Sequence, residues 1–208
     1  GSWRVPLLRL DFGALYNKFH GETELNLRTA LETAAGMAPC ILWMDEIEKG
    51  VATGSSDADG GVSRRVLGTL LTWMAERKDR VFMIATANDI ESLPPELLRK
   101  GRFDEIFFVD LPADADRAEI FRIHLAKRSH PVDSFDLPAL AAAAPLFSGA
   151  EIEQAIVAAA YAAHSEGVAM QARHVLEELR STRPLAVVRA EQVAALRRWA
   201  GERTVPAN

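Results

Sequence analysis

The chain has 208 residues, 49% of them apolar, and a formal net charge of −5. This length and apolar content allow one sizeable domain or two small ones, and the acidic balance disfavours nucleic acid as a partner. The single cysteine, Cys40, excludes an internal disulfide and favours a reducing compartment. No apolar run approaches the ~20 residues that a membrane span needs.

In the first half of the chain, short apolar runs alternate with helical patterns. Such uninterrupted runs are typical of strands buried on both faces of a parallel sheet, so we expect a four-stranded α/β layer. A short helical turn is also predicted where Pro94-Pro95 opens it. The predicted strands cover 6–11, 40–45, 81–87 and 105–111, and the predicted helices cover 23–36 and 62 to about 78.

Two of these strands place polar side chains at their carboxyl ends. The strand at 40–45 runs into Asp45 and Glu46, and the strand at 81–87 ends at Asn88. Ligands bind at the carboxyl edge of open parallel sheets, so these residues are candidates for metal and water chemistry. Taken alone, the two acids could equally form a strand-end salt bridge, and the asparagine could simply begin a turn.

After Pro112 only helical periodicity remains. Asp136 is a plausible helix cap, and Ser148 with Glu151 forms a capping-box pattern before another helix. We therefore place a domain boundary near residue 112 and divide the chain into 1–112, 113–180 and 181–208. Besides the helix after the capping box, the predicted helices cover 114–127, 137–144, about 170–180 and about 190–201.

Five segments, in this order, resemble the AAA ATPases, most closely the bacterial, cyanobacterial and plastid-encoded members. They are Lys18–Glu24, Ala38–Ile47, Ala85–Asn88, Leu98–Asp104 and Ser148–Ile152. The resemblance runs from about residue 5 to 165. It implies a P-loop NTPase-type parallel sheet followed by a helical lid at 113–180. It also implies Mg²⁺-dependent ATP hydrolysis in a ring, by default a hexamer, that remodels an unknown protein client in the cytoplasm or the plastid stroma.

The resemblance also suggests roles for single residues. Asp45 resembles the Walker-B acid that holds Mg²⁺, together with Glu46, which also resembles the base that positions the attacking water. Asn88 resembles the sensor that aligns this water with the γ-phosphate. Arg99 and Arg102 resemble the arginine fingers, whose guanidinium groups reach the nucleotide of a neighbouring copy.

Four more residues resemble ligand contacts of the family. His124, Gly149 and Ala150 resemble the adenine-side contacts of the lid, and Phe19 resembles the pore-loop aromatic that grips a polypeptide. The residues themselves leave other interpretations open, since His124 could be a packing histidine and Gly149 a first-turn residue. Phe19 could be a surface or core aromatic, and it is followed by His20 where the family usually has an aliphatic residue.

The phosphate-binding motif G-x-x-x-x-G-K-[ST] does not occur in the sequence. In the family this loop, and the strand that leads into it, come before the strand placed here at 6–11. In the family's sheet, the strand that leads into the loop lies between the strands that correspond to 81–87 and 105–111. We therefore expect the chain to be the C-terminal part of a longer ATPase, whose sheet has a gap or unpaired edges here. The alternative is a non-hydrolysing AAA-like scaffold or interaction module.

Overall fold

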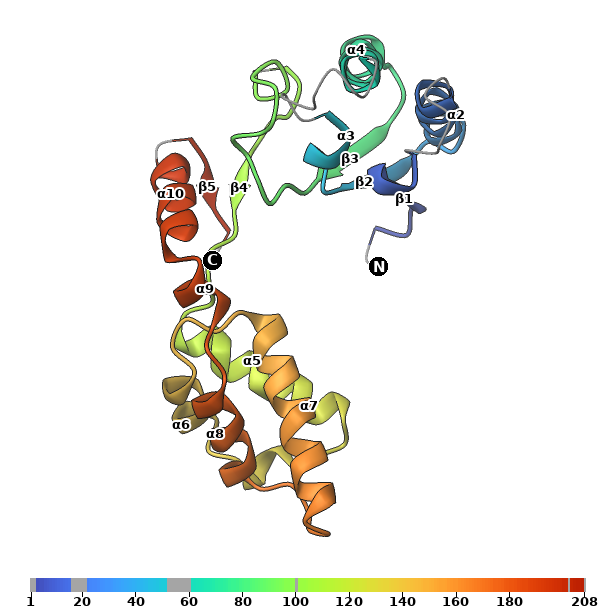
Figure 1. Ribbon diagram of the computed structural model, residues 1–208. Helices are drawn as coiled ribbons and strands as arrows, with labels where there is room; N and C mark the ends of the chain where they lie inside the picture. The colour runs from blue at the N-terminus through green and yellow to red at the C-terminus, as the bar shows by residue number, and fades with distance from the viewer. Residues whose placement is uncertain (1–2, 16–21, 52–60, 100, 202, 208) are drawn as a thin grey trace. The chain divides into compact units, whose positions relative to one another are not determined.

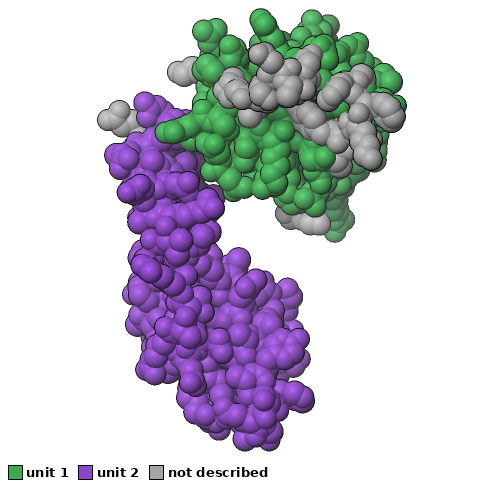
Figure 2. Space-filling model, in the orientation of Figure 1, with its two compact units in different colours: residues 1–104 green, residues 105–208 purple. Residues whose placement is uncertain are grey.

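The computed structural model describes residues 3–15, 22–51, 61–99, 101–201 and 203–207. They form two compact units, residues 1–104 and residues 105–208 (Figure 2). The first unit is a parallel α/β layer and the second is mainly helical, which confirms the predicted fold class.

The first unit is built on a parallel sheet in the order β1-β2-β3. Helices α2 (Glu22–Gly36) and α4 (Val62–Glu76) cover one face of it (Figure 1). Short helices follow the first two strands, α1 (Phe12–Leu15) after β1 and α3 (Glu48–Val51) after β2. The strands are β1 (Leu7–Asp11), β2 (Cys40–Asp45) and β3 (Val81–Ala85), which confirms three of the predicted strands to within two residues.

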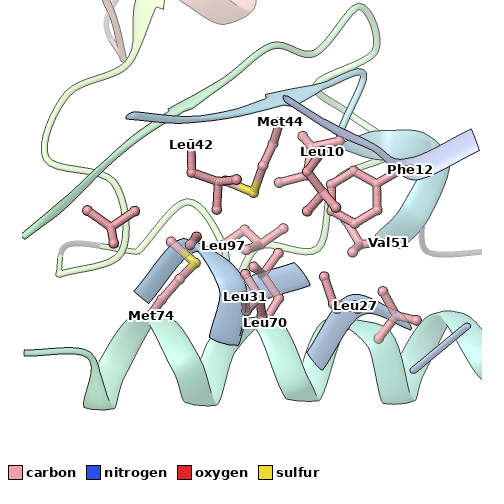
Figure 3. Packing of buried hydrophobic residues seen from close by; sticks show 14 of the residues in the cluster. Leu10, Phe12, Leu27, Leu31, Leu42, Met44, Val51, Leu70, Met74 and Leu97 are labelled. Carbon is pink, nitrogen blue, oxygen red and sulfur yellow. The ribbon is translucent and has the colours of Figure 1, made fainter. Parts of the chain in front are cut away.

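The core of this unit lies between the sheet and the two helices. Because side chains alternate along a strand, Leu42 and Met44 of β2 point toward Leu31 of α2 and Leu70 of α4 (Figure 3). These residues are at most 2% exposed, so their burial supplies the main stabilising term of the layer.

The opposite face of the sheet is also apolar, but the described residues leave it partly open. Leu7 is 61% exposed, Phe82 52% and Ile84 42%, although the ring of Trp3 packs edge-on to that of Phe82 at 5.4 Å. The expectation of strands buried on both faces is therefore not met within the described part of the chain. An apolar run indicates which strands can be buried, but burial itself depends on what packs against them.

The predicted fourth strand, at 105–111, is wrong as a member of this sheet. Only β4 (Phe107–Phe108) is extended there, and it pairs in parallel with β5 (Val205–Pro206) in a separate two-stranded sheet of the second unit. The short helical turn predicted at Pro94-Pro95 is present as two successive i→i+3 hydrogen bonds, from Leu97 N to Pro94 O and from Leu98 N to Pro95 O.

In the second unit, four of the described helices pack around their own core, which includes Phe121, Leu140 and Ile156. The predicted caps are confirmed, because Asp136 accepts a hydrogen bond from Ala139 N and Ser148 forms a reciprocal capping box with Glu151. None of the helices in the described ranges is long and apolar enough to cross a membrane. The four helices that form this core are α5 (Asp114–Lys127), α6 (Leu137–Ala143), α7 (Gly149–Ser165) and α8 (Ala172–Ser181), and a 3-10 turn lies at Val132–Ser134.

The C-terminal segment folds back onto this unit through α9 (Leu185–Val188) and α10 (Ala190–Ala200). At one point Leu185 N donates a hydrogen bond to Glu151 Oε1 at 2.7 Å. At the other, Arg197 donates to both carboxylate oxygens of Asp110 at 2.8 to 3.0 Å, next to the β4–β5 ladder. Partial burial raises the pKa of Asp110, but hydrogen bonds from Arg197 and Leu111 N outweigh it, so this pKa lies below its usual value.

Replacing Arg197 with alanine is expected to loosen β5 from β4. The amides of Val205 and Ala207, which donate to Ile106 O and Phe108 O, should exchange their hydrogens about 5-fold faster, since a half-exposed pair contributes ~1 kcal/mol or less. Hydrogen exchange measures this, and Arg198→Ala on the same helix is the matched control. The contribution is complete above the ordinary aspartate pKa of 3.8 and is lost as the pH falls through the lower pKa of folded Asp110. Unchanged exchange in Arg197→Ala would contradict the role of this ion pair.

Candidate active site

Thr86 joins the carboxyl ends of β2 and β3. Its hydroxyl donates to Asp45 Oδ1 at 2.7 Å and accepts from Glu46 N at 3.0 Å, while its carbonyl oxygen accepts from Ile47 N at 3.0 Å. Glu46 has a φ of 49°, in the left-handed region that costs a non-glycine residue about 1 kcal/mol or more. These bonds stabilise that backbone turn, so both acids leave the strand in defined directions.

The carboxylate of Glu46 is joined to Asn88, 42 residues away. Asn88 Nδ2 donates to Glu46 Oε1 at 3.0 Å, and Asn88 N donates to Glu48 Oε1 at the same distance. The structure thus brings together the two strand ends that the sequence predicts to converge. Thr86 and Glu48 are additional residues of this cluster. A hydroxyl residue two positions before Asn88 was the available signal for the first, whereas no sequence pattern singles out the second.

Each of the two acids also contacts a basic residue of its own unit. Arg9 Nη2 donates to Asp45 Oδ2 at 2.8 Å, with its guanidinium 5.0 Å from the centre of the Trp43 ring. Lys49 Nζ donates to Glu46 Oε2, and this hydrogen bond raises the pKa of the Lys49 ammonium group above its usual value. The two cations offset the repulsion between adjacent carboxylates.

The carboxylate oxygens of Asp45 and Glu46 are ligands of the kind that Mg²⁺ binds in proteins. The described residues contain no group of three or more His, Cys, Asp or Glu side chains that could hold a metal ion. Mg²⁺ takes one or two carboxylates and obtains its other ligands from water and phosphate. Asp45 and Glu46 therefore suit a cation that arrives together with a phosphate-bearing ligand.

The two predicted finger arginines differ in their surroundings. Arg99 is exposed, whereas Arg102 is half-buried and its Nη1 donates to Leu71 O of α4 at 2.6 Å. Within the described residues, no hydrogen bond or ion pair joins either arginine to Asp45 or Glu46. A single chain thus leaves Arg99 accessible and engages Arg102 with α4.

The predicted adenine-side residues lie in the second unit. His124 is 18% exposed on α5, and its Nδ1 lies 3.3 Å from Glu153 Oε1 of α7. The hydrogen bond from Arg128 lowers the pKa of Glu153. Gly149 and Ala150 are the first residues of α7, and a Cβ on Gly149 would meet Ile120 at an ordinary 3.6 Å, so packing within this unit does not require glycine there. The predicted pore-loop residue, Phe19, lies outside the described residues.

Comparison with known proteins places the chain in a family. Residues 1–111 match the model of the ATPase family associated with various cellular activities (AAA). The chain is 46% identical over 202 residues to the uncharacterized AAA domain-containing protein ycf46 of Pyropia yezoensis, covering 97% of this chain and 41% of that protein. The Guillardia theta ycf46 protein is 43% identical over 200 residues, covering 96% of this chain and 40% of that protein.

A further relative is a protease by name. The ATP-dependent zinc metalloprotease FtsH of Acidothermus cellulolyticus is 37% identical over 175 residues, which cover 80% of this chain and 26% of the protease. The chain therefore spans about two fifths or less of the length of these curated relatives. Since the AAA model matches more than half of its residues, the chain belongs to the AAA family of ATPases.

Proposed function

We propose that the protein containing this chain binds and hydrolyses ATP with Mg²⁺, in a ring of copies that remodels protein partners. The observation that carries this proposal is the hydrogen bond from Asn88 Nδ2 to Glu46 Oε1. It joins the proposed base to the proposed sensor, at the sheet edge where family members bind nucleotide. A buried strand alone accounts for neither the amide nor the second acid there.

The chain's own residues would divide the work as follows. Glu46 would orient a water molecule and take its proton, and Asn88 would keep the Glu46 carboxylate in place. Asp45, with Glu46, would hold Mg²⁺, which when bound offsets the negative charge of the phosphates. The Thr86 hydroxyl fixes the Asp45 carboxylate and the Glu46 backbone relative to each other, because it bonds to both.

The remaining proposed contacts lie outside this cluster. His124, Gly149 and Ala150 would face the adenine from the lid at 113–180, and Phe19 of the core at 1–112 would contact the client polypeptide. A hexamer is the proposed ring, and the cytoplasm or the plastid stroma is the proposed compartment. These assignments rest on the family resemblance, and the segment at 181–208 is proposed as a C-terminal helical tail.

Of the two finger candidates, Arg99 is the one whose replacement is expected to affect hydrolysis alone. Arg99→Ala should lower ATP hydrolysis about 1,000-fold, because a guanidinium that stabilises transition-state charge is lost, without changing thermal stability. Arg102→Ala should also lower the free energy of unfolding, by about 1–2 kcal/mol, because it removes the hydrogen bond to Leu71 O on α4. Steady-state hydrolysis and thermal melts of the full-length protein separate the two effects.

Mixed assemblies test whether Arg99 acts on a neighbouring copy. Arg99→Ala and Glu46→Gln proteins, each inactive alone, should recover part of the hydrolysis when combined, because some sites then pair an intact Glu46 with a neighbour's intact Arg99. Absence of recovery would contradict a finger acting between copies. Wild-type protein that binds ATP without hydrolysing it would instead favour the non-hydrolysing module.

A further inference from the structure

We infer that Lys49 is a positioning residue for the proposed base, Glu46. The inference rests on the proposed function, since it names a residue through which that base acts. Lys49 lies outside the segments that carry the family resemblance. The inference comes from the observed contact of its ammonium group with Glu46 Oε2.

Two donors hold the Glu46 carboxylate from opposite sides. Asn88 Nδ2 donates to Oε1 at 3.0 Å and Lys49 Nζ donates to Oε2. A carboxylate with a donor on each oxygen cannot turn about its terminal bond without losing at least one of them, and the bond from the ammonium is charge-assisted. Each oxygen still has a second lone-pair direction available for water. The pair of donors therefore defines the plane of the carboxylate without occupying it fully.

The backbone places Lys49 within reach of Glu46. Lys49 N donates to Glu46 O at 2.9 Å, which brings the two residues onto one turn three positions apart. The next residue, Gly50, packs directly against the buried ring of Phe12. Contact between Gly50 and the core thus holds α3 in place, and α3 carries the ammonium group to the carboxylate.

The ion pair between Lys49 and Glu46 contributes little to the free energy of folding. The Lys49 side chain is 56% exposed and that of Glu46 38%, and exposed pairs of this kind contribute about 0–1 kcal/mol to folding. Removal of the ammonium should therefore leave the fold intact and change only the orientation of the carboxylate. That separation makes the inference testable.

The test compares Lys49→Met and Lys49→Arg in the full-length protein, with Lys78→Met as the control for loss of an exposed lysine from the same unit. Lys49→Met is expected to lower kcat about 10-fold, because a misplaced catalytic group loses orientation. The KM for ATP and the affinity for a fluorescent ATP analogue should stay within about 2-fold. Lys49→Arg should recover most of kcat, since it restores a cation on Oε2.

A second comparison asks whether Lys49 acts through Glu46. In a Glu46→Gln background, Lys49→Met should cause no further loss, because effects of residues that work as a unit are not additive. An additional 10-fold loss there, an unchanged kcat in Lys49→Met, or a raised kcat would each overturn the inference. Equal hydrolysis by wild-type and Glu46→Gln proteins would overturn the proposed function itself, so the two failures are distinguishable.

Discussion

Replacing Glu46 with glutamine is expected to lower the rate of ATP hydrolysis at least about 100-fold, while the affinity for ATP stays nearly unchanged. Glutamine has the size of glutamate and can still accept the hydrogen bond from Asn88 through its amide oxygen. It cannot take a proton from water at neutral pH, and it removes the negative charge that Lys49 contacts. The loss should therefore fall on kcat rather than on binding.

Steady-state hydrolysis and direct binding of labelled ATP, both on the full-length protein, separate these quantities. Glu76→Gln is the matched control, because Glu76 ends α4 and is exposed, so the same chemical change occurs away from the cluster. The control should keep wild-type activity. A Glu46→Gln protein with near-normal turnover would remove Glu46 from the role of base, and a variant that fails to bind ATP would make its role one of binding.

Replacing Gly50 with alanine is expected to lower the free energy of unfolding of the first unit by at least about 2 kcal/mol. A Cβ at this position would lie within 2.7 Å of Cε1 and Cγ of Phe12 and closer still to Cδ1. The Phe12 ring is fully buried within the hydrophobic core. Either α3 or the ring must shift, and in both cases the contacts of Figure 3 are disturbed.

Gly68→Ala is a control with the opposite expected sign. Gly68 lies inside α4, and a Cβ there would meet nothing within 4 Å, so alanine should stabilise this unit by ~0.5–1 kcal/mol through helix propensity. Denaturant unfolding followed by tryptophan fluorescence reports mainly on this unit, because it contains Trp3, Trp43 and Trp73 of the four tryptophans. A Gly50→Ala protein as stable as the wild type, or more stable, would contradict the close packing of Gly50 on Phe12.

Local patterns account for the elements that were predicted well. The strand at 40–45 and the helix at 114–127 agree with β2 and α5 at both ends, because each is marked within a few residues by its apolar period and by polar residues at its limits. The capping box at Ser148 and Glu151 is likewise a local signal, and its hydrogen bonds are present.

The candidate site was only partly accessible to such reasoning. Asp45, Glu46 and Asn88 could be brought together in advance, since parallel strands deliver their carboxyl ends to one edge of a sheet. The contacts of Arg102 and Phe107 could not, because their partners, Leu71 and Val205, are distant in the chain and no local period encodes them. The same holds for the cation on Asp45, which comes from β1.

By itself, the sequence determined that the chain begins with parallel α/β elements, continues as helices and carries two acids and an asparagine at adjacent strand ends. Only the tertiary structure decided the pairing of β4 with β5, the hydrogen bond from Arg102 to α4, and the hydrogen bonds from Asn88 and Lys49 to the Glu46 carboxylate. The physical reason is range. Propensity and periodicity act over a few neighbouring residues, whereas ladders, most ion pairs and close packing depend on which distant segments the folded core brings into contact.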